Sequence, residues 1–166
     1  VTIDAIHLIA VSYGPGSFTG IRLACAIAQG LSMPHAIPIA PINTLDNIAW
    51  QYPKSATIFA YIDARMQEIY GCVYKKTPKT LTPLTKVQLI PRRQRARLPH
   101  QGPIIGMGNI DLKERGLLCK QWVHTHPTAT SLTQIARKMS PKKYCSADQL
   151  KPFYVRNHVA SPKTAS

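Results

Sequence analysis

Apolar and polar positions in the first third of the chain predict a strand followed by a helix. The run IHLIAVSY (Ile6–Tyr13) is apolar and ends at a glycine turn, as expected of a buried strand. From Ser17 to Met33 the apolar residues recur at helical spacing. Ser17 suits the N-cap, and Pro34 ends the helix because it cannot donate a backbone hydrogen bond.

The middle of the chain predicts another strand, a second helix and a hairpin. AIPIAPI (Ala36–Ile42) reads as a short strand limited by proline, and Thr44–Tyr52 as a helix capped by Asn43 or Thr44. Residues 55–76 alternate like two strands joined at DARMQE, which predicts a β-hairpin. The prolines of Thr77–Pro91 restrict that region to a loop or an edge strand.

The last third predicts one strand, one helix and an extended end. Gly102–Asp111 places two isoleucines before Gly106–Asn109, so we expect a strand that ends there in a tight turn. Thr130–Met139 predicts an amphipathic helix with Leu132, Ile135, Ala136 and Met139 on one face. Leu150–Ala160 closes the chain as an extended segment.

Composition narrows the class of protein. The 166 residues are 45% hydrophobic, enough for one ordinary domain or two small lobes. No apolar run reaches the roughly 18 residues that a membrane span needs, and the N-terminus lacks a signal-peptide pattern, so we expect a cytoplasmic protein. The four cysteines include no CxxC pair, which argues against a zinc site and favours buried or free thiols.

The net charge of +14 predicts an anionic partner. Basic residues gather in Pro91–His100, Arg137–Lys143 and Lys151–Lys163. Charge predicts non-specific phosphate binding without sequence readout. Direct contact with nucleic acid and a merely basic surface therefore both remain open.

The stretch YGPGSFTGIRLA (Tyr13–Ala24) raises the question of a phosphate site. Unpaired backbone N–H groups and the helix dipole at such a turn attract anions. The stretch matches neither the Walker A spacing nor the dinucleotide fingerprint, and its glycines alternatively serve only to shape the connection. The candidate phosphate-binding residues are Gly14, Gly16, Ser17, Thr19, Gly106 and Gly108.

The helix behind this turn carries a stripe of small residues, which would let another helix approach closely. The alternative is packing against its own sheet. Arg22 stands alone as a charge on this apolar helix, as expected of a residue that pairs across an interface or with a phosphate. The candidate partner-interface residues are Gly20, Arg22, Ala24, Ile27, Ala28 and Leu31.

Two groups of polar residues could carry chemistry. Asp63, Arg65 and Glu68 could hold Mg²⁺ or act in acid–base catalysis, but we favour a structural salt-bridge set at the hairpin. His124 and His126 lie two residues apart, so they could share a metal on one strand face. The pair has no evident third ligand, and we expect neither a metal site nor catalytic residues.

Three motifs together resemble the TsaB (YeaZ) family. GPGSFTGIRLACAIAQGLS, IDARMQEIY and LKPFYVRN occur in the family's order and at about its spacing. The resemblance extends from Ile6 to about Asn157 and is weakest over 77–101. It implies an α/β, actin-like ATPase (ribonuclease H-like) fold with two lobes, here residues 1–54 with the partner helix and 55–166.

The resemblance also implies a function. TsaB-like proteins are non-catalytic subunits that pair with TsaD through helices of the N-terminal lobe, in the complex that forms N6-threonylcarbamoyladenosine at position 37 of tRNA. TsaE joins that heterodimer, and tRNA is reached through the complex. We expect this chain alone to bind no cofactor, with ATP and Mg²⁺ entering in the complex.

One departure from the family concerns the N-terminus. Family members open with a few strands and a helix that precede the position of Val1, so we expect a fragment with an incomplete N-terminal lobe. Uncovered edges of that lobe would then promote a homodimer or strand exchange through residues 1–50.

Two other functions compete with this one. A metal-dependent glycoprotease-like hydrolase could use Asp63, Glu68, His124 and His126, but no HExxH helix is present. A basic RNA-binding module could use Arg92, Arg93, Arg95 and Arg97, but no aromatic residues are interleaved there for base stacking.

Overall fold

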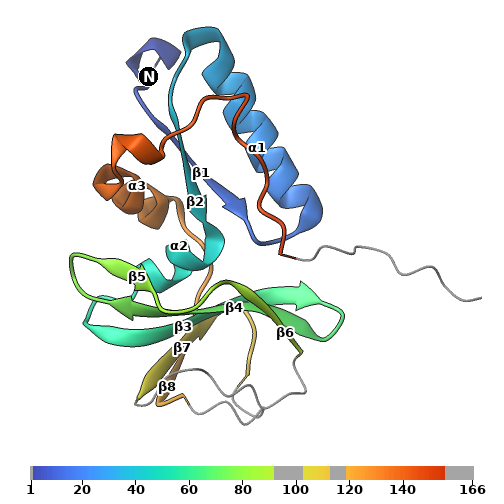
Figure 1. The fold of residues 1–166 in the computed structure, drawn as a ribbon, viewed down its shortest axis with the longest axis vertical. Coiled ribbons are helices and arrows are strands. Elements are labelled where there is room, and N and C mark those ends of the chain that lie inside the picture. Colours follow the sequence, from blue (N-terminus) through green and yellow to red (C-terminus); the bar gives the residue numbers. More distant parts are fainter. Residues whose placement is uncertain (1, 92–102, 113–118, 156–166) are drawn as a thin grey trace, which may run out of the picture.

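The computed structural model describes residues 2–91, 103–112 and 119–155, which form two β-sheets with helices between and beside them (Figure 1). The first sheet pairs two parallel strands, and the second has six strands in the order β5-β4-β3-β7-β8 with β6 also on β4. Among the described residues, no helix combines the length and apolar content needed to cross a bilayer.

The first sheet belongs to a β-α-β unit. Strand β1 (Ile9–Gly14) leads into helix α1 (Phe18–Ser32), and β2 (Ile39–Asn43) returns parallel to β1, with Ile9 opposite Ile39. Parallel neighbours need such a crossover, and the helix covers the sheet. A 3₁₀ turn (Met33–His35) follows α1 and contains the proline that ends it.

The second sheet is built around a hairpin. Strands β3 (Ala56–Arg65) and β4 (Glu68–Lys76) pair antiparallel. Met66 and Gln67 both have positive φ, which gives the two-residue turn the right-handed twist of the strands. The remaining strands are β5 (Leu81–Pro83), β6 (Gln88–Pro91), β7 (Ile104–Gly108) and β8 (Gln121–His124).

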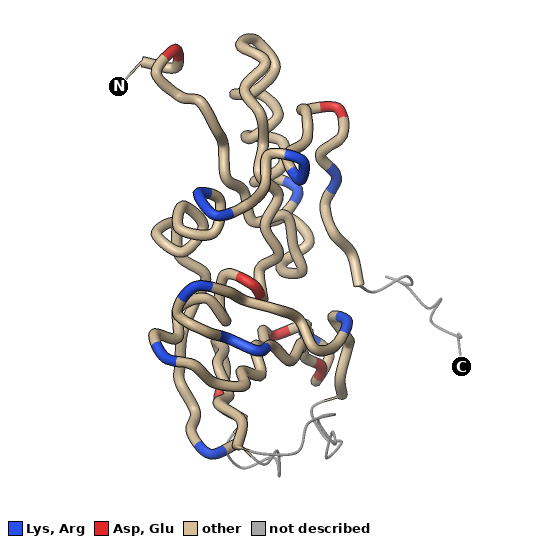
Figure 2. The backbone as a smooth tube through the Cα atoms, turned by 60° about the vertical axis from the view of Figure 1, so that its left-hand side comes forward, with Lys and Arg blue, Asp and Glu red and all other residues tan. Residues whose placement is uncertain are grey.

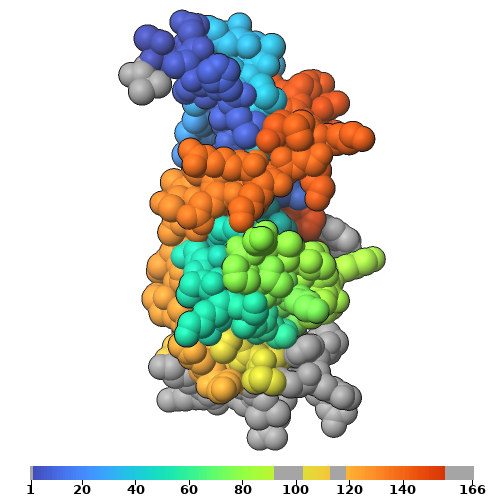
Figure 3. Space-filling model, turned by 90° about the vertical axis from the view of Figure 1, so that its left-hand side faces the viewer, coloured from blue at the N-terminus to red at the C-terminus, as the bar shows by residue number. Residues whose placement is uncertain are grey.

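Two helices cross between the sheets. Helix α2 (Thr44–Trp50) follows β2 directly, yet its Leu45 and Ile48 pack into the core of the second sheet. Helix α3 (Ala129–Lys138) follows β8, yet its Ala136 packs against Ile42 of the first sheet. Figure 3 shows the chain after β8, in orange, lying against the N-terminal part of the molecule. The predicted division at residue 54 therefore separates the strands of the first sheet from those of the second. It does not separate the helices, because α2 and α3 each pack against the sheet on the other side of this division.

Most of the predicted elements are present, with two corrections. The predicted helices over 17–33, 44–52 and 130–139, the hairpin over 55–76 and the edge strands before Pro91 are confirmed. The first strand begins at Ile9 rather than Ile6, because its pairing with β2 starts at Ile9 opposite Ile39. The tight turn predicted at Gly106–Asn109 is wrong, since both glycines lie inside β7.

Candidate functional site

A cleft of about 610 Å³ lies where the start of α1 faces the β3–β4 hairpin. Residues 153–155, which are remote in sequence, line it as well. The lining comes from six separated parts of the chain, which lie within 12–24, at 44, within 62–70, at 109, at 127 and at 153–155. It includes Gly16, Ser17, Phe18, Gly20, Asp63, Arg65, Asn109 and Tyr154.

The turn into α1 is held by its own cap and by the C-terminal segment. The Ser17 hydroxyl accepts a hydrogen bond from the Gly20 backbone N–H at 3.4 Å. Gly14 has φ of 125°, and a Cβ there would lie 2.5 Å from the Phe153 carbonyl oxygen. Since Phe153 N–H donates to the Tyr13 carbonyl at 2.8 Å, close backbone contact is what requires a glycine at position 14.

The hairpin side of the cleft is organised by Asp63. Its backbone N–H donates to Asn109 Oδ1 at 3.0 Å, and its Oδ1 accepts from Arg65 N–H at 2.8 Å. An ion pair of 4.0 Å joins the Asp63 carboxylate to the Arg65 guanidinium. Glu68 is the cross-strand neighbour of Arg65. Asp63 thus contributes to shaping the turn and contacts Arg65, and the structural role of the three charges as a set stays a prediction.

The predicted phosphate-binding residues do not all meet at the cleft. Gly16 and Ser17 line it, but Gly106 and Gly108 lie buried in β7 and are not part of its lining. A Cβ on Gly106 would overlap the Trp122 ring, and one on Gly108 would overlap Tyr61. These two glycines are thus explained by packing, and a phosphate role for the others stays a prediction. Thr19 is exposed near the start of α1.

The outward face of α1 is apolar and uncovered. Leu23 is 59% exposed, Ile27 54% and Leu31 46%, and their four-residue spacing places them in one row. Of the predicted stripe, Gly20 is exposed and Ala24 half-buried, whereas Ala28 is only 3% exposed. Ala28 packs in the core, so a partner docked on α1 cannot reach it. Leu23 was not among the predicted interface residues, although it begins the exposed row.

Arg22 lies in a group of three side chains that the sequence does not predict. Its guanidinium stacks 3.8 Å from the centroid of the Phe18 ring, and its Nε–H donates to the Tyr154 hydroxyl at 2.7 Å. The Phe18 and Tyr154 rings are 5.9 Å apart. We call these three residues the Phe18–Arg22–Tyr154 cluster. The lone arginine on an apolar helix was the only signal in the sequence, because its partner Tyr154 is 132 positions away.

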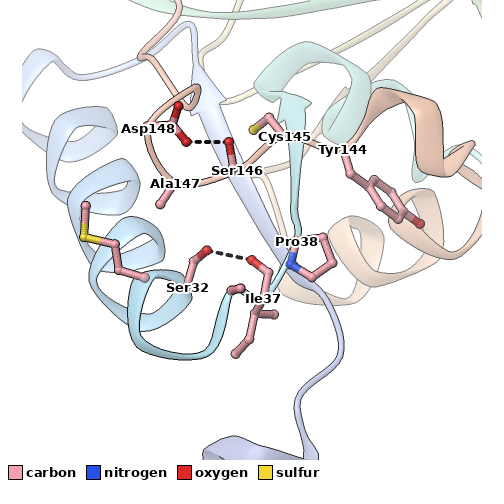
Figure 4. Close-up of a pocket in the computed structure, with 10 residues that line it drawn as sticks. Ser32, Ile37, Pro38, Tyr144, Cys145, Ser146, Ala147 and Asp148 are labelled. Atoms are coloured by element: carbon pink, nitrogen blue, oxygen red, sulfur yellow. Dashed lines mark hydrogen bonds between the residues drawn. The ribbon is translucent and has the colours of Figure 1, made fainter.

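A second pocket of about 380 Å³ lies between the end of α1 and residues 144–148 (Figure 4). Its polar groups largely satisfy one another, since Ser32 Oγ donates to the Ile37 carbonyl at 2.6 Å and Ser146 Oγ bonds Asp148. Burial, and then the charge of Asp148, raises the pKa of the Cys145 thiol on its wall. Cys145 is therefore a protonated thiol near neutral pH and a poor nucleophile.

The other thiols and the histidine pair offer little chemistry. Burial raises the pKa of Cys25 and Cys72, and that of Cys119 to about 11. The rings of His124 and His126 meet edge to face at 5.0 Å. Within the described ranges, no three His, Cys, Asp or Glu side chains are arranged to hold a metal ion. The predicted basic residues at 92–97 lie outside those ranges.

Comparison with known proteins identifies the family to which the chain is similar. Residues 1–148 match the family model described as "TsaD: tRNA N6-adenosine threonylcarbamoyltransferase". The chain is 31% identical to "tRNA threonylcarbamoyladenosine biosynthesis protein TsaB" of Escherichia coli (strain K12), over 95% of this chain and 74% of that protein. It is 38% identical to the protein of the same name from Haemophilus influenzae, over 41% of this chain and 30% of that one.

The comparison with solved structures agrees with the sequence comparison. The solved structure "YeaZ from Pseudomonas aeruginosa" superposes with a TM-score of 0.84 at 25% identity, covering 93% of this chain and 76% of that one. The expected α/β, actin-like fold is thereby confirmed. Sequence and structure lead to one conclusion: the chain belongs to the TsaB (YeaZ) family.

Proposed function

We propose that this chain is a non-catalytic subunit that pairs with TsaD in the complex that forms N6-threonylcarbamoyladenosine at position 37 of tRNA. Its membership of the TsaB family supports a role in making this nucleoside. The observation that carries the pairing is the uncovered apolar row on α1, formed by Leu23, Ile27 and Leu31.

The three side chains of the row offer apolar area that a partner can bury. A fully buried leucine or isoleucine side chain gains about 1.5–3 kcal/mol relative to the exposed state, and about half of each of these three side chains remains exposed. The exposed glycines at positions 20 and 30 flank the row, and glycine lets a second helix approach closely. A helix of TsaD laid along α1 would cover this row.

The remaining partners bind to the complex of TsaD with this chain. TsaE joins the heterodimer of TsaD with this chain, and tRNA is bound by the assembled complex. ATP and Mg²⁺ also enter through the complex rather than through this chain alone. Without TsaD, the same apolar row, or strand exchange through residues 1–50, supports a homodimer.

The pairing is tested by co-purification with tagged TsaD from the same source. Ile27→Asp puts a charge into the centre of the row, so we expect capture by TsaD to fall at least tenfold, since leaving a charge in an apolar interface costs several kcal/mol. Light scattering of the free chain should report less homodimer in the same variant.

The matched control is Leu84→Asp. Leu84 is 44% exposed after β5, away from α1, so the same change in charge should leave capture by TsaD unchanged. Undiminished capture of Ile27→Asp would contradict pairing through this face. Equal loss in both variants would point to a general effect of charge.

A further inference from the structure

The Phe18–Arg22–Tyr154 cluster lies on one side of the cleft and joins two distant segments. Phe18 and Tyr154 are both part of the cleft lining. The Arg22 guanidinium stacks on Phe18 at 3.8 Å and lies 5.8 Å from the Tyr154 ring centroid. Two aromatic rings of the cleft lining and one planar cation thus lie in mutual contact.

This surface is open to solvent. Phe18 is 47% exposed and Tyr154 42%, although large aromatic side chains are usually buried. Arg22 donates to Tyr154, and no carboxylate of the described residues forms an ion pair with it. One face of the Phe18 ring carries the Arg22 guanidinium. The exposed parts of both rings lie beside this positive charge, which forms no ion pair with an acidic group of the described chain.

A second cation lies across the cleft. The Arg65 side chain is 89% exposed, its contact with Asp63 is 4.0 Å long, and Glu68 is its cross-strand neighbour. The whole chain carries +14, and in Figure 2 lysine and arginine positions are found along both lobes while acidic positions are few. The cleft of this basic chain is thus lined by Phe18, Tyr154, Asp63 and Arg65, and Arg22 is stacked on the Phe18 ring.

We propose that this cleft binds single-stranded RNA directly, with a base stacked on Phe18 and Tyr154 and the flanking phosphates held by Arg22 and Arg65. Aromatic platforms inside positive grooves bind single strands in this way, without sequence readout. The choice of RNA as the polyanion rests on the proposed role in tRNA modification. The proposal adds that this chain itself, rather than its partners alone, contacts the RNA.

The test is titration of the purified chain with a labelled oligoadenylate of about 12 nucleotides, followed by fluorescence anisotropy at low salt. Phe18→Ala and Tyr154→Ala should each weaken binding about 5- to 150-fold, the range expected for loss of one stacked base. Tyr154→Phe keeps the ring and should bind within about twofold of the unchanged chain.

The control variant is Met33→Ala. Met33 is 70% exposed beyond the far end of α1, and its loss should not alter the affinity for RNA. A second readout uses Phe18→Trp, because oligoadenylate stacked on the new indole should quench its fluorescence, whereas heparin, a polyanion without bases, should not. Circular dichroism of each variant checks that the fold is intact.

Several outcomes would overturn the proposal. Unchanged RNA affinity in both alanine variants would mean that the RNA binds elsewhere through charge alone. Equal losses in Tyr154→Phe and Tyr154→Ala would mean that the hydroxyl link to Arg22, rather than stacking, matters. If Phe18→Ala no longer bound TsaD but still bound RNA with unchanged affinity, the cluster would be a contact for the protein partner rather than for RNA. If the unchanged chain bound RNA but was not captured by TsaD, the proposed function would be contradicted and the RNA-binding proposal would stand.

Discussion

At the scale of single residues, space around the backbone explains the glycines better than ligand chemistry does. Gly108 lies in β7 directly beside the backbone and ring of Tyr61, whereas Gly30 lies in α1 with nothing within 4 Å of where a Cβ would be. The same substitution should therefore have opposite effects at the two positions.

We expect Gly108→Ala to destabilise the protein by about 1–3 kcal/mol, because overpacking moves Tyr61 and its strand. Gly30→Ala is the matched control and should raise the free energy of unfolding by about 0.5–1 kcal/mol, because alanine loses less entropy in a helix. Urea denaturation of both variants measures this. A neutral Gly108→Ala would contradict the packing explanation.

At the scale of elements, a tryptophan joins two helices to the second sheet. Trp50 of α2 lies 4.3 Å from the Lys76 ammonium of β4 and 4.8 Å from that of Lys138 in α3, measured to the ring centroid. Lys76 is only 3% exposed and donates to the Thr77 carbonyl at 2.6 Å. Burial, and then the charge of Lys138, lowers the pKa of Lys76 below 10.5.

This pKa shift predicts a dependence of stability on pH. A lysine whose pKa is lower in the folded protein makes folding release protons, so stability rises with pH between the lowered pKa and 10.5. The free energy of unfolding of the unchanged chain should therefore increase relative to Lys76→Met as the pH rises toward 10.5.

The control for this effect is Lys75→Met, which removes the adjacent exposed lysine of the same strand. Its difference from the unchanged chain should vary less with pH than that of Lys76→Met. Urea denaturation at several alkaline pH values measures both differences. Parallel curves for the two variants would contradict a special environment for Lys76.

At the scale of the whole molecule, the two sheets are held together where the chain crosses between them. Asn47 of α2 is fully buried. Its Nδ2 donates to the Thr128 carbonyl at 2.9 Å, and its Oδ1 accepts from Thr128 N–H at 3.0 Å. Thr128 caps α3, so one asparagine fixes the point from which the chain returns to the first sheet.

We expect Asn47→Ala to lower the free energy of unfolding by about 1–3 kcal/mol, because the variant loses both hydrogen bonds between the fully buried Asn47 side chain and the Thr128 backbone. Thr133→Ala, an exposed change on α3, should stay within about 0.5 kcal/mol. Thermal unfolding monitored by circular dichroism compares them. Equal stability of the two variants would show that this crossing does not hold the lobes together.

Local patterns were sufficient to predict most helices and strands. Ser17 and Asn43 cap α1 and α2 as expected, because a cap acts within a few residues. The turn predicted at Gly106–Asn109 failed, because glycine signals conformational freedom and equally signals a close neighbour. Only the tertiary positions of Trp122 beside Gly106 and of Tyr61 beside Gly108 show that a close neighbour is the cause here.

The candidate site was less predictable than the fold. Gly16, Ser17, Asp63 and Arg65 were selected from the sequence and do line the cleft. Tyr154 was not selected, because its contact with Arg22 spans 132 positions and therefore produces no periodic pattern in the sequence. Leu23 was also missed, since the spacing of small residues does not reveal which side of a helix meets its own sheet.

The family, the α/β class, the caps, the hairpin and the strongly positive charge follow from the amino-acid order alone, because these depend on local spacing and composition. The tertiary structure decided which side of α1 is exposed, which glycines serve packing, and which aromatic rings meet Arg22. The physical reason is that such properties arise from contacts between distant segments. The return of the chain after β8 to the first sheet, for example, brings Tyr154 to Arg22 and Leu150 into the core beside α1.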